Sequence, residues 1–325
     1  MKDTITRLTG FEYVIPTHQG RAAENVLFSH LVHNGDIVPG NSHFDTTKGH
    51  IESRKAVALD CTVDEAKDTQ LEVPFKGNVD PAKLETALKQ YKDKIPFIIV
   101  TVTNNTAGGQ PVSMQNLREV RALADKYGKR VIFDSARFVE NAYFIKTRED
   151  GYADKTIKEI VKEMFSLADG MTMSSKKDGL VNMGGFIATR HEDWYEGAKK
   201  FCIPFEGYLT YGGMNGRDMA ALAVGLEENT EFDNIETRIK QVQYLAARLD
   251  EYGIPYQRPV GGHALFVDAD KVLSSVPKEE FPAQTLAIEL YLEAGIRGCE
   301  IGYILADRDP VTCLLYTSDA ADEAR

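Results

Sequence analysis

Short apolar runs alternate with helix-like stripes along most of this chain. Residues 97–102 (Phe, Ile, Ile, Val, Thr, Val) form a continuous apolar and β-branched run, which suits a strand buried on both faces of a parallel sheet. Shorter runs at 131–133 and 170–173 repeat the pattern. Apolar residues at helical spacing precede or separate these runs, at 84–91, 117–127 and 157–168. This order predicts an α/β fold with a mostly parallel sheet and helices on both faces.

The pattern changes near residue 234. An amphipathic stripe over 235–249 is followed by a strand candidate at 263–267, a helix at 282–294 and a second strand candidate at 296–301. We therefore predict a large domain at 1–233 and a smaller α+β domain at 234–312. Residues 313–325 show no periodicity and look like translated adapter sequence, so we predict that they are a non-native tail.

Charge and cysteine spacing narrow the classes of partner. The formal net charge of −11 disfavours nucleic acid or an anionic membrane as the main partner. The four cysteines are far apart, so neither a zinc site nor a secreted disulfide framework is visible. The chain start lacks the apolar core of a signal peptide, and the longest apolar run is too short to span a bilayer. These features fit a cytoplasmic enzyme, as they fit many other soluble proteins.

Polar residues follow each of the three apolar runs. Asn105 comes after the first run, Asp134 and Arg137 after the second, and Ser174 and Lys177 after the third. Because ligands in open parallel sheets bind beyond the carboxyl ends of the strands, we expect these side chains to converge.

Such a set would suit pyridoxal 5′-phosphate (PLP). A carboxylate keeps the pyridine nitrogen protonated, and a lysine binds the aldehyde and moves the Cα proton. Each residue also has an ordinary alternative: Asp134 as a turn or cap residue, Arg137 in a surface ion pair, and the Lys176–Lys177 pair in a solvated turn. Their joint position at consecutive strand ends favours the PLP interpretation.

A phosphate site is predicted at residues 19–21. Gln19, Gly20 and Arg21 open a helix with apolar residues behind them. Glycine permits close backbone approach, and a helix N-terminus attracts an anion. Many helices begin near Gly and Arg, so this segment indicates a phosphate site only in combination with the other predicted site residues.

Several longer motifs resemble the β-eliminating lyases, the family that contains tryptophanase and tyrosine phenol-lyase. The matching segments are Pro-Thr-His-Gln-Gly-Arg at 16–21, Ala-Gly-Gly-Gln-Pro-Val-Ser at 107–113, Glu-Asn-Ala-Tyr-Phe-Ile-Lys at 140–146, Ser-Ser-Lys-Lys-Asp at 174–178, Tyr-Gly-Gly at 211–213, Pro-Val-Gly-Gly-His-Ala at 259–264 and Phe-Pro-Ala-Gln at 281–284. The resemblance extends to about Pro310. It implies the aspartate-aminotransferase-like fold (fold type I), PLP as cofactor, a potassium ion and a homotetramer.

The resemblance also implies roles for single residues. Lys177 matches the Schiff-base lysine, and Asp134 matches the partner of the pyridine nitrogen. The remaining matches are Gln19, Gly20, Arg21 and Ser174 as phosphate contacts, Phe44 as the ring stacked on the pyridine, Asn105 and Arg137 near the phenolic oxygen, and Asn182 as a ligand of the monovalent cation.

Two positions bear on the substrate. Asp45 matches the residue expected at this position in tryptophanase, whereas the phenol-lyases resemble one another in having Thr there. Ile301 falls where the phenol-lyases carry an arginine that meets the phenol oxygen, and an apolar side chain there suits indole. The resemblance therefore predicts β-elimination of L-tryptophan to indole, pyruvate and ammonium. L-Tyrosine is the first alternative, and an aminotransferase, an aldolase or an inactive PLP-binding remnant on the same fold is the second.

Parts of the family machinery are expected to lie outside this chain. The resemblance places a tyrosine general acid and a carboxylate ligand of the cation in a region ahead of Met1. It places the arginine for the substrate carboxylate in a C-terminal segment that 313–325 replaces. We therefore expect the 325-residue chain to be incomplete at both ends, to hold PLP weakly and to turn over poorly.

Overall fold

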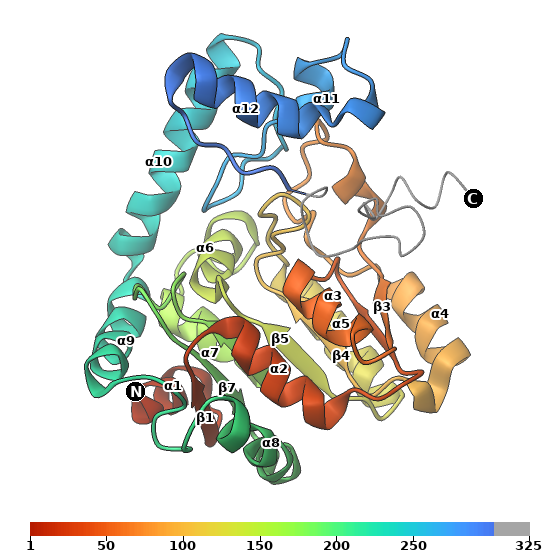
Figure 1. The fold of residues 1–325 in the computed structure, drawn as a ribbon, viewed down its shortest axis with the longest axis vertical. Helices are drawn as coiled ribbons and strands as arrows, with labels where there is room; N and C mark the ends of the chain where they lie inside the picture. Colours follow the sequence, from red (N-terminus) through yellow and green to blue (C-terminus); the bar gives the residue numbers. More distant parts are fainter. Residues whose placement is uncertain (302–325) are drawn as a thin grey trace.

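The computed structural model describes residues 1–301 and places one mostly parallel sheet at the centre of the molecule (Figure 1). In these residues the strand order is β1-β7-β6-β5-β4-β2-β3. The strands are β1 (Tyr13–Thr17), β2 (Ile37–Gly40), β3 (Val57–Asp60), β4 (Ile98–Thr101), β5 (Val131–Asp134), β6 (Gly170–Ser174) and β7 (Gly185–Thr189). Strand β7 is antiparallel to both neighbours, and the other pairs are parallel. The predicted mostly parallel sheet is confirmed.

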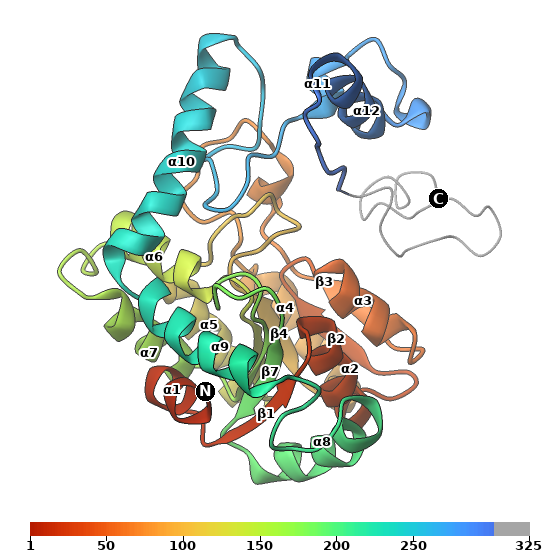
Figure 2. The ribbon, with the colours of Figure 1, turned by 60° about the vertical axis from the view of Figure 1, so that its left-hand side comes forward.

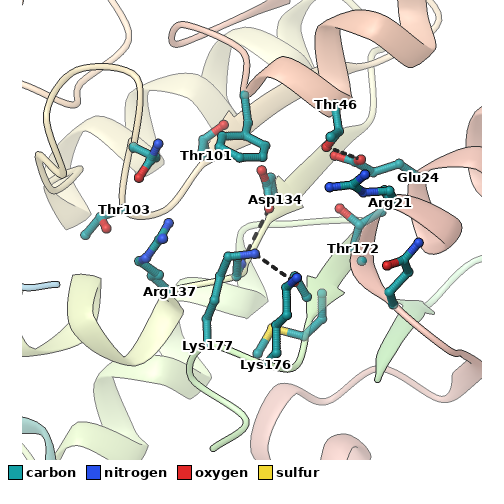
Figure 3. A pocket seen from close by; sticks show the side chains of 17 residues that line it. Arg21, Glu24, Thr46, Thr101, Thr103, Asp134, Arg137, Thr172, Lys176 and Lys177 are labelled. Carbon is teal, nitrogen blue, oxygen red and sulfur yellow. Dashed lines mark hydrogen bonds between the residues drawn. The ribbon is translucent and has the colours of Figure 1, made fainter. Parts of the chain in front are cut away.

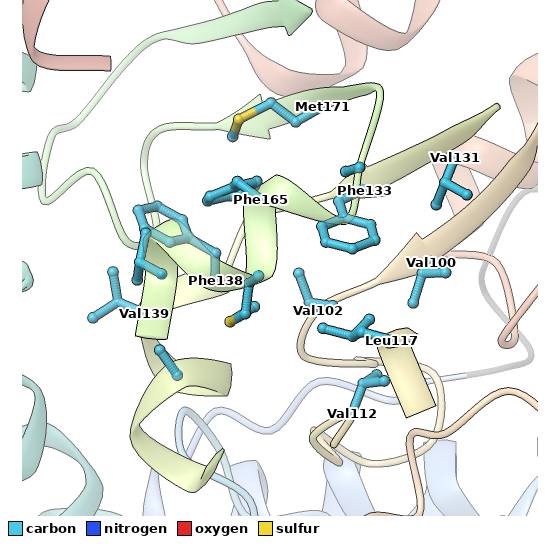
Figure 4. Close-up of a cluster of buried hydrophobic side chains, with 14 of the residues drawn as sticks. Val100, Val102, Val112, Leu117, Val131, Phe133, Phe138, Val139, Phe165 and Met171 are labelled. Carbon is cyan, nitrogen blue, oxygen red and sulfur yellow. The ribbon is translucent and has the colours of Figure 1, made fainter. Parts of the chain in front are cut away.

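Alternate residues of the central strands pack on opposite faces of the sheet. Val131 and Phe133 of β5 belong to one apolar cluster, while Ile132 between them belongs to another. Because successive side chains of a strand point to opposite faces, each cluster marks one face. Figure 4 shows part of the first cluster, where Phe133, Phe138 and Phe165 gather. Burial of both faces explains why these strands are continuously apolar.

Helices cover both clusters. On the first face lie α1 (Lys2–Thr9), α4 (Pro81–Tyr91), α5 (Met114–Lys126), α6 (Phe138–Arg148), α7 (Ile157–Ser166) and α9 (Gly216–Asn229), and on the second lie α2 (Gly20–Leu31), α3 (Asp45–Glu52) and α8 (Glu192–Phe205). Single-turn helices are η1 (Asp64–Lys67), η2 (Lys92–Lys94) and η3 (Lys278–Glu280). Helices on both faces were predicted, and the structure confirms them.

Two helix starts follow the sequence signals closely. The Asp80 carboxylate accepts hydrogen bonds from the backbone N–H groups of Ala82 and Lys83, at 2.8 and 3.1 Å, and Pro81 opens α4. The Ser113 hydroxyl accepts from the N–H of Asn116 at 3.1 Å at the start of α5. Both caps satisfy N–H groups that have no partner within their helix.

The region after residue 231 is mainly helical and extends beyond the end of the sheet (Figure 2). It contains α10 (Phe232–Glu251), α11 (Ala269–Val272) and α12 (Pro282–Ala294). Helix α10 runs along the edge of the molecule, and α12 has the bounds that the sequence predicts. The division at residue 234 stays a prediction, and 313–325 lie outside the described residues.

Both strand predictions in this region were wrong. Residues 263–267 form a single antiparallel bridge, between Tyr256 and Val267. Pro255 and Pro259 interrupt the opposing segment, and proline has no N–H to extend a ladder. Residues 296–301 are irregular. Within 1–301 all seven strands belong to the central sheet, which leaves this segment without a partner strand.

Candidate functional site

Three strand ends meet at one edge of the sheet. Thr101 of β4 pairs in register with Asp134 of β5, and Asp134 pairs with Thr172 of β6. These residues line a cavity of about 250 Å³ together with Asn105, Arg137 and Lys177 (Figure 3). The predicted convergence of the polar strand ends is confirmed. Thr101 and Thr172 were missed, although their register beside Asp134 followed from the predicted sheet.

Lys177 lies in the turn after β6, and its side chain reaches back to the strand end. Its Nζ donates to the Ser174 hydroxyl oxygen at 2.7 Å and lies 6.0 Å from the centre of the Phe44 ring. Burial, helped by the nearby Arg137 charge, lowers the pKa of Lys177 to about 8, against the opposing effect of Asp134. Lys176 is exposed. Both lysines line the cavity, but only Lys177 is half-buried.

Asp134 is a buried carboxyl at the floor of the cavity. Burial raises its pKa, while Lys177, the backbone N–H of Ala136 and Arg137 act in the opposite direction. The Ala136 N–H donates to Asp134 Oδ1 at 3.4 Å. A carboxylate in this position would gain strongly from a cation placed against it, because little solvent stabilises its charge.

The N-terminus of α2 closes another side of the cavity. Gln19 is the N-cap, and Gly20 and Arg21 begin the helix. A Cβ on Gly20 would lie 2.5 Å from the Ser174 Cβ and 2.8 Å from its Cα. Glycine at this position therefore lets α2 approach the end of β6 closely. The helix dipole, the Arg21 guanidinium and the Ser174 hydroxyl together suit an anion.

Glu24 is a buried carboxyl in the cavity wall that the sequence analysis missed. Its oxygens accept hydrogen bonds from the Thr46 and Thr47 hydroxyls, at 2.6 and 2.5 Å. Burial and the nearby Asp134 charge raise the pKa of Glu24 to about 7, although both threonines and Lys177 oppose the shift. A glutamate one turn after Gly20, on the buried face of a predicted helix, was the available signal.

Phe44 and Asn105 come from two loops at the same cavity. Phe44 caps the N-terminus of α3 and lines the cavity. Asn105 lies in the loop after β4, with its Oδ1 2.9 Å from Nε2 of His263. Arg137 precedes α6 and also lines the cavity. These predicted contacts are thus brought together by the fold.

Three predicted residues do not line this cavity. Asp45 follows Phe44 at the start of α3, and Asn182 is exposed in the loop between β6 and β7. Ile301, at the limit of the described residues, is 39% exposed. No group of three or more His, Cys, Asp or Glu suited to a metal occurs in residues 1–301. Asn182 carries an amide oxygen, and its role as a potassium ligand stays a prediction.

Comparison with known proteins assigns the chain to a family. The model of the family described as "Beta-eliminating lyase" matches residues 1–322. This chain belongs to the β-eliminating lyase family. The match confirms the predicted family, which is PLP-dependent, and the seven-stranded, mostly parallel sheet agrees with the predicted fold type I. The chemistry expected of Lys177 and Asp134 is that of this family, while the role of each residue stays a prediction.

Individual relatives carry two different activity names. A "Probable beta-eliminating lyase" of Trichomonas vaginalis is 80% identical over 312 residues, which are 96% of this chain and 68% of the relative. A tyrosine phenol-lyase of Pasteurella multocida is 51% identical over 98% of this chain and 69% of its own length. A tryptophanase of Salinibacter ruber is 48% identical over 95% and 66%. The chain thus spans about two thirds of each relative, and overall identity does not separate the two activities.

A solved structure supports the fold independently of sequence. The crystal structure of a SepCysS–SepCysE N-terminal domain complex matches with a TM-score of 0.58 at 15% identity. The match covers 86% of this chain and 71% of the other. At this identity the likeness concerns the fold alone. Among residues 1–301, no helix is long and apolar enough to cross a membrane.

Proposed function

We propose that this chain belongs to an enzyme that carries out PLP-dependent β-elimination of an amino acid, with L-tryptophan as the substrate and indole, pyruvate and ammonium as the products. The observation that carries the proposal is the arrangement of one cavity. The Lys177 amine, the Asp134 carboxyl and the N-terminus of α2 all line it. Membership of the β-eliminating lyase family supports the reaction class.

The residues present fit PLP by their chemistry. Gln19, Gly20, Arg21 and Ser174 would hold the phosphate, because they offer a helix N-terminus, a guanidinium and a hydroxyl at one end of the cavity. The close packing of Gly20 on Ser174 leaves that end free of a side chain from residue 20. Asp134 would face the pyridine nitrogen, and Phe44 would cover the ring.

Lys177 supplies the base. When bound, PLP withdraws electrons from the substrate Cα and so makes its proton acidic. With a pKa lowered to about 8, the Lys177 amine is partly neutral near neutral pH and can accept a proton. The Ser174 hydroxyl holds Nζ at the strand end, where the amine can also bind the cofactor aldehyde.

Asp134 supplies the negative charge. Its carboxyl is buried and its pKa is raised, so the ionised form needs a cationic partner. A protonated pyridine nitrogen would be such a partner, and Arg137 and Asn105 would meet the cofactor at another edge of the cavity.

The choice of substrate rests on two residues. Neither lines the cavity, so the choice rests on the sequence resemblance: Asp45 matches tryptophanase, and Ile301 stands where a charged partner for phenolate would be expected. L-Tyrosine is the second candidate, favoured by the 51% identity with a tyrosine phenol-lyase. The proposal further includes a potassium ion with Asn182 among its ligands, a homotetramer, a cytoplasmic location, and domains at 1–233 and 234–312.

Two measurements test the proposal. The chain is incubated with PLP and reduced with borohydride, and peptides are analysed by mass spectrometry. A phosphopyridoxyl group on Lys177 is expected, and its absence would refute the PLP site. Products that the full-length enzyme forms from L-tryptophan and L-tyrosine are then separated by chromatography. Indole with pyruvate from tryptophan is the expected pair, whereas phenol from tyrosine alone would overturn the substrate assignment.

A further inference from the structure

A fully buried carboxylate lies behind the cavity, on the first turn of α6. Glu140 has no exposed side-chain surface and accepts from three side chains. The Thr103 hydroxyl donates to Oε1 at 2.8 Å, Arg238 Nη2 donates to Oε2 at 3.2 Å, and His263 Nδ1 is 2.8 Å from Oε1. Burial alone would raise the pKa of Glu140, but His263, Arg238 and Arg137 lower it to about 2. The carboxylate is therefore ionised.

His263 connects this carboxylate to the cavity. Its Nδ1 faces Glu140, and its Nε2 lies 2.9 Å from the amide oxygen of Asn105. An ionised carboxylate can only accept a hydrogen bond, so Nδ1 is the donor to Glu140. The same ring places Nε2 against the Asn105 amide oxygen. With its oxygen engaged by His263, Asn105 keeps its amide nitrogen for the cavity that it lines.

The surrounding backbone fits this chain of contacts closely. A Cβ on Gly109 would lie 2.9 Å from the His263 Cε1, and a Cβ on Gly262 would lie 2.6 Å from the Glu140 Cγ. The two glycines thus let the imidazole and the carboxylate pack directly against backbone. Phe266 meets the ring edge-on at 5.7 Å between centroids. These contacts leave His263 little freedom to turn.

Arg238 fixes the carboxylate from the other side. Its Nη1 donates to Asp178 Oδ1 at 2.9 Å, while its Nη2 reaches Glu140. Asp178 Oδ2 also accepts from the N–H groups of Val139 and Glu140, at 2.8 and 3.2 Å, at the start of α6. Arg238 of α10 thus joins the Glu140 carboxylate to Asp178, the residue that follows Lys177.

We propose that Glu140 is a positioning residue of the cofactor pocket, which acts through His263 to hold the Asn105 amide with its nitrogen towards the bound ligand. The proposal rests on the PLP site proposed above. It assigns to Glu140 and His263 an effect on cofactor binding, although neither lines the cavity. An ordinary buried ion pair would stabilise the fold without this dependence on Asn105.

PLP affinity of the apo chain tests the coupling. PLP is titrated into the wild type and the variants Asn105→Ala, His263→Gln and Asn105→Ala/His263→Gln. Each single variant is expected to bind at least about tenfold more weakly, and the double variant no more weakly than Asn105→Ala. This non-additivity is expected because His263 acts through Asn105. Losses that multiply in the double variant would overturn the proposal.

Glu140→Gln and a matched control separate positioning from stability. Glu163 also accepts from three side chains, those of Arg118, Tyr152 and Lys155, but none of them bonds to Asn105 or lines the cavity. Glu140→Gln is expected to weaken PLP binding and to alter the absorption spectrum of the bound cofactor. Glu163→Gln should lower the melting temperature only. If Glu140→Gln does not fold, the Asn105 and His263 variants decide the matter.

The outcomes distinguish this inference from the proposed function. A wild-type chain that binds no PLP would overturn the proposed function, and this inference with it. Equal PLP affinity in the wild type and the His263→Gln variant would overturn this inference alone.

Discussion

The Lys177 amine lies 2.7 Å from the hydroxyl oxygen of Ser174, three residues earlier in the chain. Ser174 ends β6, and Gly20 of α2 packs directly against it. One serine thus anchors the lysine and also forms part of the proposed phosphate cradle. This arrangement explains how a lysine in a turn after a strand returns to the strand end instead of extending into solvent.

The two adjacent lysines are expected to differ in their reaction with PLP. Lys177→Ala should abolish the borohydride-stable adduct, because its amine is the half-buried one at the strand end. Lys176→Ala should retain the adduct, because Lys176 is exposed. Mass spectrometry of the reduced chain measures both. An adduct of equal yield in Lys177→Ala would move the proposed attachment site elsewhere.

The lowered pKa of Lys177 predicts a pH dependence of its reactivity in the apo chain. Below about pH 8 the amine is protonated and unreactive, and above it the amine is neutral. Acetylation with a limiting amount of an amine-specific reagent should therefore show a midpoint near pH 8 for Lys177.

The same shift makes the stability of the chain depend on pH. Between about 8 and the unfolded value of 10.5, the unfolded chain binds more protons, so this group makes the folded state more stable as pH rises.

Peptide mapping after acetylation at several pH values measures the first effect. Lys177 in the urea-unfolded chain, where the ordinary pKa of 10.5 applies, serves as the reference. Profiles of Lys177 that coincide in the folded and unfolded chain would contradict the predicted difference.

The sheet and the strand-end residues were predictable because short-range patterns determine them. Continuous apolar runs predicted β4, β5 and β6, and their order placed Asn105, Asp134 and Lys177 at one edge. The partners of these residues were not predictable in the same way. Glu24 meets Thr46 and Thr47, and Glu140 meets His263, across sequence separations that no periodicity encodes. The failed strand at 263–267 has the same origin, since pairing depends on a distant segment interrupted by prolines.

Gly20 and Gly49 offer a matched pair of glycine substitutions. Gly20→Ala would place a methyl group 2.5 Å from the Ser174 Cβ, so we expect a destabilisation of about 1–3 kcal/mol. PLP binding should weaken as well, because the cradle must shift. Gly49 lies within α3 with nothing near its Cβ position, and Gly49→Ala should stabilise the chain by about 0.5–1 kcal/mol.

Urea denaturation of the two apo variants, followed by PLP titration, checks this pair. Opposite signs of the change in unfolding free energy are expected. A neutral effect of Gly20→Ala on both quantities would mean that α2 does not need its close approach to Ser174.

Glu24 predicts a pH dependence of stability with the opposite sign to that of Lys177. Its pKa is raised to about 7 in the folded chain from an ordinary value of 4.5, mainly by burial and by Asp134. Between these pH values the folded state binds more protons, so stability falls as pH rises from 4.5 towards 7. The accumulated loss is roughly 3 kcal/mol once both states are ionised.

Glu24→Gln removes this titration and keeps the size of the side chain; its amide oxygen can accept from one threonine hydroxyl, and its NH2 group can donate to the other. Relative to the wild type, the apo variant should therefore become more stable as pH rises from 5 to 8.

Thr47→Val removes one donor to the carboxyl and should raise the pKa of Glu24 further. The loss of stability of the apo chain should then occur at higher pH than in the wild type. Urea unfolding at several pH values measures both variants. A constant difference between Glu24→Gln and the wild type across this range would show that Glu24 does not titrate there.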